Sequence, residues 1–380
     1  MLMKQQAQKQ LRIMQVSKIK VIISGGGTGG HIFPALAIAG ALKKIAPDTD
    51  ILFVGAKGKM EMEKVPGNGY PIIGLWISGF QRGFSLSNLL FPIKLLVSMV
   101  NALFIILKFK PAIVIGTGGY ASGPVLRAAT WLNIPILIQE QNNFPGVTNR
   151  ILGRKAACIC TAFERMEIYF PKDKILLTGN PIREEIFTNK PILQDALKAF
   201  ELDADKPVVF VVGGSQGARS INQAISSNLA FFKENNIQLI WQTGKAYYQT
   251  ALRETENIRY QGIKVFDFIN GINMAFEAAT VVISRAGAIA ISELCRVGKP
   301  VILVPFPYAA GDHQTKNALA LKEKHAAILI PDTEILKELT VKLESLLANK
   351  DEQKRLSESI KLMAIPNAAD TIAKKILSII

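Results

Sequence analysis

The sequence of 380 residues contains little cysteine, and this bounds the class of protein. Its three cysteines, Cys158, Cys160 and Cys295, are too few for the disulfide framework of a small secreted domain. Cys158 and Cys160 alternate in a strand-like run, which favours plain buried thiols. We therefore expect a protein of a reducing compartment such as the cytoplasm.

A signal peptide and low-complexity tracts are also missing. Residues 1–16 are polar and rich in Gln and Lys, without the apolar core of a signal peptide, and we predict that they form a loose N-terminal extension. The composition is that of a folded protein, with 49% hydrophobic and 20% charged residues. A chain of this length favours two domains over one.

Acidic residues are scarce in the first half of the chain. Residues 1–200 hold 24 Lys and Arg against 11 Asp and Glu, whereas residues 201–380 hold 21 against 19. Most of the net charge of +15 therefore lies in the first half, which predicts an anionic partner there. Aromatic-flanked basic clusters and known nucleic-acid motifs are absent, so we expect no nucleic acid and favour an anionic membrane surface.

The sequence is rich in glycine directly after short apolar runs. Val21-Ile-Ile leads into Ser24, residues 25–30 contain five glycines and Thr28, and an apolar, alanine-rich run follows His31. This pattern predicts a strand, a tight loop and a helix. A loop without Cβ atoms lets a ligand approach the backbone, and a helix N-terminus offers free N–H groups, so the stretch suits a phosphate or pyrophosphate.

The first loop also fits the dinucleotide pattern G-x-G-x-x-G, through Gly25, Gly27 and Gly30. A dinucleotide site needs an Asp or Glu at the end of the next strand to bind the ribose hydroxyls. The predicted second strand, Asp50–Gly55, leads into Ala56 and Lys57 instead. The missing acid argues against a nicotinamide dinucleotide, although Lys57 leaves open a contact to a 2′-phosphate.

Residues 75–109 are unusually rich in large apolar side chains and carry basic residues at their edges. The longest uncharged run in this stretch, Leu95–Leu107, has 13 residues, fewer than the roughly 20 that cross a bilayer. Two interpretations remain: a helix buried beside a core loop, or an apolar, cation-rimmed patch that rests on an anionic leaflet. The predicted membrane-contact residues are Trp76, Phe80, Arg82, Phe84, Leu90 and Lys94.

A second glycine loop, residues 117–124, follows the predicted strand Ala112–Gly116. Two such loops in one domain could line a single crevice at the carboxyl ends of a parallel sheet. The predicted strand Pro135–Ile138 then leads into Gln139-Glu-Gln-Asn142. There we expect Glu140 to hold the loop and Asn142 to be a candidate ligand contact.

The opening pattern restarts at Val208, about 187 residues after Val21. The apolar run Val208–Val212, a loop at 213–218 and a helix from about Arg219 repeat it, and further strands are predicted at Gln238–Gln242, Ile263–Phe266, Val281–Ser284 and Val301–Pro305. An α/β protein of two Rossmann-like domains, with parallel sheets facing a cleft, is therefore expected. We divide the chain into the extension (1–16), a first domain (17–183), a linker (184–206), a second domain (207–364) and a C-terminal helix (365–380) that packs back on the first domain.

Seven stretches resemble the motifs of the MurG family of glycosyltransferases, in the family's order. They are Gly26-Gly-Thr-Gly-Gly-His31, Gly118-Gly-Tyr-Ala-Ser-Gly-Pro124, Glu140-Gln-Asn142, Gly179-Asn-Pro-Ile-Arg183, Gly213-Gly-Ser-Gln-Gly-Ala218, Ser284-Arg-Ala-Gly-Ala288 with Glu293, and Asp312-His-Gln-Thr315. Each is weak alone, but seven in register are specific. The resemblance implies a GT-B fold, a donor bound mainly by the second domain, a lipid acceptor on the first, and peripheral association with the cytoplasmic face of the bacterial plasma membrane.

The resemblance also implies roles for the matching residues. Those implied to bind the donor UDP-N-acetylglucosamine (UDP-GlcNAc) are Thr28, Gly29, Gly30, Asn142, Arg183, Ser215, Ile269, Ala288, Ile289, Ala290, Ile291, Ser292, Glu293 and Gln314, and those implied to bind the acceptor are Gly118, Gly119, Tyr120 and Ser122. Arg183 and Ser215 suit the phosphates, and Glu293 suits the ribose hydroxyls. The family usually has Thr where this chain has Ala290, so a side-chain contact there would be lost.

The implied reaction is an inverting transfer of GlcNAc to the MurNAc 4-hydroxyl of undecaprenyl-pyrophosphoryl-MurNAc-pentapeptide (lipid I), which gives lipid II in peptidoglycan synthesis. The hydroxyl must lose a proton, and His31 is the candidate base. The alternative is a structural histidine that bonds to the second glycine loop. No metal or other cofactor is expected, because helix N-termini and Arg183 can neutralise the diphosphate. The D-x-D sequence of Asp48 and Asp50 falls at the amino end of a predicted strand and reads as a turn.

Two other functions stay open. One is another GT-B nucleotide-sugar transferase that acts on a different lipid or small acceptor. The other is a non-catalytic membrane-surface scaffold, which the polar residues at several strand ends disfavour.

Overall fold

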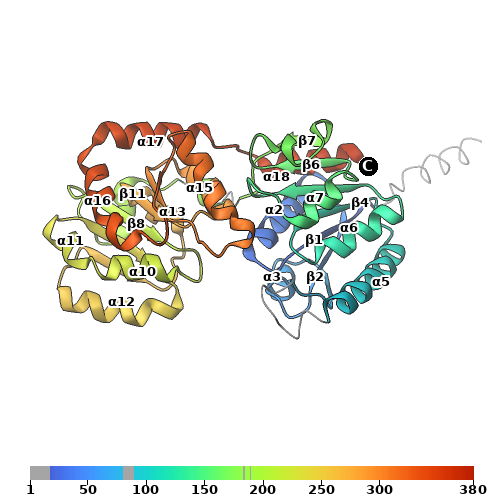
Figure 1. The fold of residues 1–380 in the computed structure, drawn as a ribbon, viewed down its shortest axis with the longest axis horizontal. Coiled ribbons are helices and arrows are strands. Elements are labelled where there is room, and N and C mark those ends of the chain that lie inside the picture. The colour runs from blue at the N-terminus through green and yellow to red at the C-terminus, as the bar shows by residue number, and fades with distance from the viewer. Residues whose placement is uncertain (1–17, 80–89, 183–184, 189) are drawn as a thin grey trace, which may run out of the picture.

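The chain folds into two α/β domains, each built on one parallel sheet (Figure 1). The computed structural model describes residues 18–79, 90–182, 185–188 and 190–380. All strand pairings in the two sheets are parallel. Parallel pairing follows from the alternation of strands and helices, because a crossover must carry the chain back before the next strand begins.

The first sheet has seven strands in the order β3-β2-β1-β4-β5-β6-β7. Its interior strand β1 is buried on both faces, since Ile22 packs into one hydrophobic cluster and Val21 and Ile23 pack into another. The strands are β1 (Lys20–Gly25), β2 (Asp50–Ala56), β3 (Ile72–Leu75), β4 (Ile113–Gly118), β5 (Ile136–Glu140), β6 (Cys158–Thr161) and β7 (Ile175–Leu177). The helices of this part are α2 (Gly29–Ile45), α3 (Glu61–Gly67), α5 (Phe91–Phe109), α6 (Ser122–Trp131) and α7 (Val147–Gly153).

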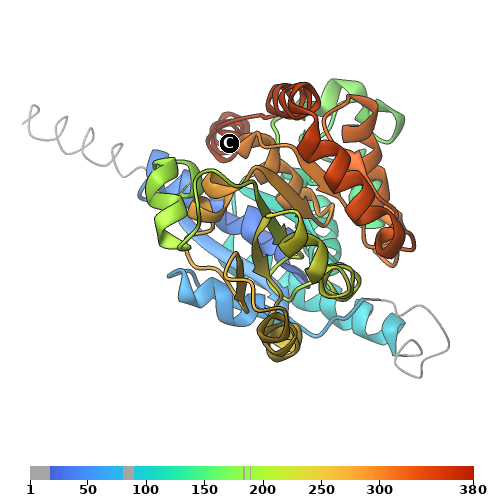
Figure 2. The ribbon, with the colours of Figure 1, turned by 90° about the vertical axis from the view of Figure 1, so that its left-hand side faces the viewer.

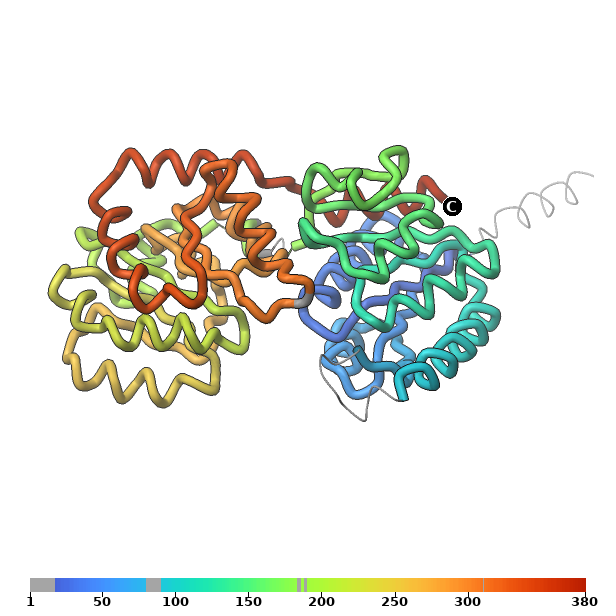
Figure 3. Tube along the Cα trace, viewed as in Figure 1, coloured from blue at the N-terminus to red at the C-terminus, as the bar shows by residue number. Residues whose placement is uncertain are grey.

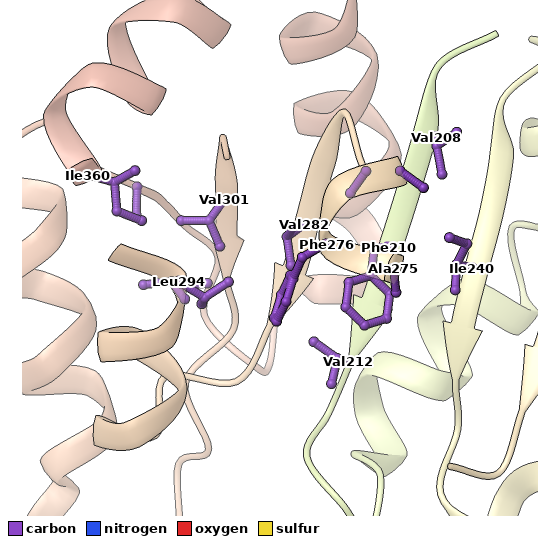
Figure 4. Packing of buried hydrophobic residues seen from close by; sticks show 14 of the residues in the cluster. Val208, Phe210, Val212, Ile240, Ala275, Phe276, Val282, Leu294, Val301 and Ile360 are labelled. Carbon is purple, nitrogen blue, oxygen red and sulfur yellow. The ribbon is translucent and has the colours of Figure 1, made fainter. Parts of the chain in front are cut away.

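The second sheet has six strands in the order β10-β9-β8-β11-β12-β13. In one of its cores, the rings of Phe210 and Phe276 meet edge to face with centroids 5.3 Å apart (Figure 4). The strands are β8 (Val208–Val212), β9 (Gln238–Gln242), β10 (Ile263–Phe266), β11 (Val281–Ser284), β12 (Val301–Leu303) and β13 (Ile328–Leu329). The helices from residue 185 onward are α8 (Glu185–Thr188), α9 (Leu193–Ala199), α10 (Arg219–Ser226), α11 (Leu229–Glu234), α12 (Lys245–Ile258), α13 (Ile272–Ala278), α14 (Ala288–Val297), α15 (His313–Glu323), α16 (Ile335–Ala348), α17 (Lys350–Leu362) and α18 (Ala368–Ile379).

The last helix returns to the first domain. After α16 and α17, the chain crosses over and ends in α18. The red helices α17 and α18 follow the upper side of the molecule (Figures 2 and 3). α18 packs against α2, and Ile372, Ala373 and Ile376 lie fully buried in a core cluster of the first domain. The predicted fold, two Rossmann-like domains with a C-terminal helix that packs back on the first, is therefore confirmed.

Some strand ends differ from the predicted ones. β4 and β5 each run two residues further, to Gly118 and Glu140, because Gly118 pairs with Gly25 of β1 and Glu140 pairs with Thr161 of β6. β12 ends at Leu303, two residues before the predicted end at Pro305, as expected for a residue that cannot donate to the ladder. Gln139 and Glu140 are thus strand residues rather than loop residues.

The two sheets share one topology, and it positions the site. In each sheet the direction of strand addition reverses at the first strand, between β1 and β4 and between β8 and β11. Open α/β sheets bind ligands at the carboxyl ends of the strands beside such a reversal. The loops after all four of these strands, at 26–28, 119–121, 213–218 and 285–287, are ones that the sequence pattern singles out.

Candidate active site

The two glycine loops of the first domain pack against each other. A Cβ on Gly119 would overlap the backbone oxygen of Gly26, and a Cβ on Gly118 would lie 2.7 Å from Nδ1 of His31. Gly118 and Gly119 also have φ angles of +97° and +82°, which favour glycine. Glycine at these positions therefore lets the loop after β4 reach the first turn of α2.

His31 lies in that first turn, and β4 fixes its ring. Nδ1 is 3.0 Å from the backbone oxygen of Thr117 and 3.2 Å from Oε1 of Gln141. Because a carbonyl oxygen only accepts, Nδ1 carries the proton, and the neutral imidazole keeps its lone pair on Nε2. If His31 is a structural histidine, it should bond to the second glycine loop, and its contact with Thr117 is such a bond. It leaves Nε2 as the nitrogen that can accept a proton.

The surroundings of His31 favour its neutral form. Burial lowers the pKa of the imidazole below 6.5, and the charge of His313 contributes in the same direction. The bonds to Gln141 and Thr117 and the charge of Glu61 oppose this shift without cancelling it. His31 is still partly exposed. A neutral, partly exposed imidazole has the properties of a general base, and this role stays a prediction.

A buried carboxylate that the sequence pattern does not reveal supports the first loop. Glu61, the first residue of α3, is fully buried. Its two oxygens lie 3.1 and 3.0 Å from the backbone nitrogen of Gly27, and one of them lies 3.0 Å from that of Ala56. An acidic side chain therefore does lie at the end of β2. It belongs to Glu61 of α3 and not to residues 55–57.

Glu140 holds the loop that carries Asn142. The buried carboxylate accepts from the backbone nitrogens of Asn142 (3.0 Å) and Gly146 (3.2 Å) and from Nδ2 of Asn149 (2.8 Å). Burial raises the pKa of Glu140, and these bonds oppose the rise. The loop-holding role expected for Glu140 is confirmed, whereas the ligand contact of Asn142 stays a prediction.

Buried amides connect His31 to the second domain. Gln141 faces His31 through Oε1, and its Nε2 donates to Oε1 of Gln139. Gln139 donates to Oδ1 of Asn180 at 2.9 Å, and Nδ2 of Asn180 donates to Oγ of Ser292 at 3.0 Å. Ser292 belongs to α14 of the second domain. A polar chain therefore runs from the candidate base to a helix predicted to bind the nucleoside.

The loop after β8 presents Ser215 at the carboxyl edge of the second sheet, where this residue is exposed. Gln242, at the end of β9, ties this loop to a second segment. Its Nε2 donates to the backbone oxygen of Gly214 at 3.1 Å, and its Oε1 accepts from the backbone nitrogen of Ile269 at 3.0 Å. Gln242 is buried, and the sequence pattern did not predict its role in holding these segments. It joins the segments expected to bind the diphosphate and the uracil.

α14 begins at Ala288, immediately after the turn that follows β11. The free N–H groups and the positive end of its dipole therefore lie at the carboxyl edge of the sheet. Its residues 288–293 include Ile289, Ala290 and Ile291, as well as Glu293, which is only 7% exposed. This burial excludes the solvated surface carboxylate that an isolated helical glutamate usually is.

Arg285 fixes the loop after β12, to which Gln314 is attached. Its guanidinium pairs with Asp332 and donates to the backbone oxygen of Pro305 at 3.3 Å. The next residue, Phe306, donates its backbone N–H to Oε1 of Gln314 at 2.9 Å. Gln314 can therefore offer its amide Nε2 to a sugar hydroxyl.

The two domains meet directly around these residues. Oδ1 of Asn142 accepts from Nδ2 of Asn317 at 3.3 Å, and the backbone nitrogen of Asn143 donates to Oδ1 of Asn317 at 2.9 Å. A cavity of about 440 Å³ lies beside this contact, and its walls come from both domains, including Phe163 of the first and Lys324 of the second. The contact and the cavity mark a cleft between the domains. Of the predicted donor contacts, Asn142 lies at the contact, and Ile291 and Ser292 line the cavity.

Two further predictions concern phosphate and metal. Arg183 lies outside the described residues, so its contact to the UDP phosphates stays a prediction. Over the described ranges, no group of three or more His, Cys, Asp or Glu side chains is placed to hold a metal ion. Asp48 and Asp50 lie at the amino end of β2, at the edge of the sheet opposite the glycine loops.

Helix α5 carries an exposed apolar stripe on the first domain. Its buried residues are Ser98, Ala102 and Ile106, whereas other apolar side chains are exposed to solvent at helical spacing. We call these the α5 stripe: Ile93, Leu96, Val100, Phe104 and Leu107, which are 44–67% exposed. The interpretation of this segment as a buried helix is therefore wrong.

Three of the six predicted membrane contacts can be placed near this helix. Trp76 and Leu90 are 44% and 45% exposed, and Nζ of Lys94 lies 5.8 Å from the centroid of the Trp76 ring. The other three, Phe80, Arg82 and Phe84, lie outside the described residues. With 19 residues, α5 is long and apolar enough to span a membrane by length and composition alone. It packs instead along α6 as part of the first domain.

Known proteins match both halves of this architecture. The model of the glycosyltransferase family 28 N-terminal domain matches residues 21–161, and that of the glycosyltransferase family 28 C-terminal domain matches residues 208–372. The chain is 52% identical over 361 residues to the UDP-N-acetylglucosamine–N-acetylmuramyl-(pentapeptide) pyrophosphoryl-undecaprenol N-acetylglucosamine transferase of Cytophaga hutchinsonii, covering 95% of this chain and 97% of that protein. It is 51% identical over 367 residues to the enzyme of the same name from Porphyromonas gingivalis, covering 96% of each.

A solved structure agrees with these matches. The crystal structure of Acinetobacter baumannii MurG superposes with a TM-score of 0.76 at 29% identity, covering 95% of this chain and 99% of that one. Identity of about half, sustained over nearly the whole length of both domains, exceeds what a shared fold alone would give. This chain belongs to the MurG family of glycosyltransferases, within glycosyltransferase family 28.

Proposed function

We propose that this protein transfers GlcNAc from UDP-GlcNAc to the MurNAc 4-hydroxyl of lipid I and so forms lipid II in peptidoglycan synthesis. The observation that carries the proposal is the identity of about half, across both domains, to relatives named for this transfer. The cleft supports it, because the first domain contributes a candidate base and the second contributes two exposed loops and a helix N-terminus.

The chemical step is a single displacement with inversion. The oxygen of the acceptor hydroxyl bonds to C1 of GlcNAc as the bond from C1 to the UDP oxygen breaks, and the hydroxyl proton passes to Nε2 of His31. The tautomer fixed by Thr117 supports this role, because it keeps the lone pair on Nε2. UDP leaves with the electron pair of the broken bond.

The departing diphosphate needs positive charge. Ser215 and Arg183 are proposed to bind it, with the N-terminus of α14 beside them, while Glu293 binds the ribose and Gln314 the GlcNAc hydroxyls. Thr28, Gly29 and Gly30 are proposed to face the donor from the other side of the cleft. On this proposal the protein needs no metal or other cofactor.

The acceptor is anchored in a lipid bilayer, so the enzyme must meet the membrane. The α5 stripe, together with the excess of basic residues in the first half of the chain, suits an anionic leaflet. Gly118, Gly119, Tyr120 and Ser122 of the same domain are proposed to bind the acceptor. We place the protein at the cytoplasmic face of the bacterial plasma membrane, bound peripherally and without a nucleic-acid partner.

A transfer assay tests the proposed function. Purified protein is given UDP-GlcNAc and a lipid I analogue in detergent, and both UDP and the lipid-linked product are measured. We expect equal amounts of UDP and lipid-linked disaccharide. Binding of UDP-GlcNAc without transfer would favour a GT-B enzyme with another acceptor, and binding of neither substrate would favour the membrane-surface scaffold.

A further inference from the structure

The carboxyl end of β2 is the place where a dinucleotide-binding βαβ unit keeps an acid for the ribose. Here Glu61 fills this place from within the protein. A Cβ on Gly55 would lie 2.6 Å from Cγ of Glu61, and a Cβ on Gly26 would overlap the carboxylate. The glycines at both positions therefore make room for this side chain, which explains why the strand end itself carries no acid.

Glu61 also occupies one backbone hydrogen-bond donor of the first loop. Both carboxylate oxygens face the backbone nitrogen of Gly27, at 3.1 and 3.0 Å, and one of them also faces that of Ala56. Bonds to a charged acceptor are roughly twice as strong as neutral ones. The amide of Gly27 is therefore held by the protein and is not free to bind a phosphate of a nucleotide.

We propose that Glu61 is a positioning residue for the transfer reaction, which fixes the first glycine loop and closes the nucleotide site of the first domain. The first glycine loop then lies on the acceptor side of the cleft, and Thr28, Gly29 and Gly30 at the start of α2 keep their proposed place facing the donor held by the second domain. This inference rests on the proposed function, because it takes the lipid-linked sugar as the ligand of that side. Residues 28–31 follow the fixed loop directly, so the orientation of His31 depends on it.

The charge of Glu61 adds a second effect. Burial lowers the pKa of His31, and the charge of Glu61 opposes that shift. Burial raises the pKa of Tyr120, and the charge of Glu61 adds to the rise. A Cβ built on Gly27 would lie 2.9 Å from Oη of Tyr120. The other groups that influence His31 are Thr117 and Gln141 of its own domain and the charge of His313 from the second. A fixed negative charge nearby stabilises the imidazolium that forms when Nε2 accepts the hydroxyl proton.

The test compares Glu61→Gln, Glu61→Asp and the matched control Glu63→Gln, which lies on the same helix but is exposed. The Gln variant keeps the length and loses the charge, whereas the Asp variant keeps the charge and is shorter by one methylene group. For each variant we would measure thermal unfolding, the Kd for UDP, kcat and KM for the lipid I analogue, and the pH dependence of kcat/KM. UDP binding reports separately on the second domain.

We expect Glu61→Gln to melt cooperatively, bind UDP like the wild type, and lose about 100-fold in kcat/KM for the acceptor. The acidic limb of its pH profile should move to lower pH, because the charge that raises the pKa of His31 is gone. In Glu61→Asp the limb should stay near that of the wild type while kcat/KM falls. Glu63→Gln should match the wild type in every measurement.

The inference would be overturned if the wild type transfers sugar and Glu61→Gln has the same kcat/KM for the acceptor and the same acidic limb as the wild type. A wild type that transfers no sugar would instead overturn the proposed function. If the Gln variant does not fold, the Asp variant decides, and an unchanged kcat/KM in that variant would also overturn the inference. Weakened UDP binding in both variants would show that Glu61 acts on the donor side, which contradicts it as well.

Discussion

At His31, one backbone oxygen fixes which ring nitrogen carries the proton. The oxygen of Thr117 cannot donate, so it holds the imidazole proton on Nδ1 and leaves Nε2 for chemistry. The hydroxyl of Thr117 donates to the backbone oxygen of His31 at 2.9 Å, so the helix start is tied to β4 as well. A histidine that supports the loop and a histidine that acts as a base are therefore compatible.

The pH profile of the wild type follows from this environment. Because burial lowers the pKa of His31 below 6.5, the base stays neutral until the pH falls below that value. We therefore expect the acidic limb of kcat/KM to be centred below pH 6.5, with activity retained as the pH falls to that point. Initial rates across the acidic range would measure it. A limb centred above pH 6.5 would show that another group controls the reaction.

Gly118→Ala should disturb the base without touching the donor domain. The added Cβ would lie 2.7 Å from Nδ1 of His31, at a φ of +97° that L side chains rarely adopt. A displaced imidazole should lower kcat by about 100-fold. The control is Gly40→Ala in α2, where an added Cβ meets no atom within 4 Å. Equal kcat in the two variants would contradict the expected position of the ring.

The supporting residues Glu61 and Gln242 were not predicted from the sequence, and the reason is the same for both. Glu61 and Gln242 act on loops that are 34 and 27 residues away along the chain, and a sequence motif records only local spacing. The places of His31 and Ser215 could be predicted because they stand in or next to glycine loops that directly follow strands, whereas their roles stay predictions. A supporting side chain becomes visible only when the fold brings its element back to the loop.

At the scale of elements, α5 shows why composition alone left two interpretations. An apolar helix of 19 residues fits a buried position and a membrane surface equally well, and only the contacts decide between them. The structure buries Ser98, Ala102 and Ile106 and leaves the α5 stripe in solvent. The sequence pattern also did not predict the edge strands β3 and β13, which are short, with four and two residues.

Removing the α5 stripe should weaken membrane binding and leave the fold intact. In the triple variant Leu96→Gln, Phe104→Gln and Leu107→Gln, each lost apolar side chain should cost about 1 kcal/mol or more of insertion free energy. We expect at least a tenfold lower partition into anionic vesicles in cosedimentation, with an unchanged melting temperature. The matched control is Leu336→Gln, Val341→Gln and Leu362→Gln, which are exposed on the second domain. Equal partition of the two variants would assign membrane contact to another surface.

At the scale of the whole molecule, the uneven charge should make membrane binding depend on salt. The excess of basic residues lies in the first half of the chain, which also carries the α5 stripe. Salt shortens the Debye length from about 10 Å at 0.1 M to about 3 Å at 1 M, so attraction to an anionic leaflet should weaken. We expect partition to fall with added salt on anionic vesicles and to change little on neutral ones. A salt response that is the same on both would argue against charge attraction.

The two-domain architecture was the most predictable property of the molecule. The same order of strand, glycine loop and helix occurs twice, and each copy becomes a sheet with the same strand order. The sequence could not show how the domains meet, because contacts such as that of Asn180 with Ser292 join residues 112 positions apart. The cleft therefore follows from the fold, and the proposal that His31 lies opposite the donor loops is the central claim.

The variant His31→Ala tests that claim most directly, through turnover and donor affinity measured on the same preparation. We predict that kcat for transfer to the lipid I analogue falls by about 100- to 10,000-fold, as for the loss of a general base. The Kd for UDP-GlcNAc should stay within about twofold of the wild type, because the proposed diphosphate and nucleoside contacts lie in the second domain and at Arg183. Turnover that survives the substitution, or a loss of donor affinity as large as the loss of turnover, would contradict the claim.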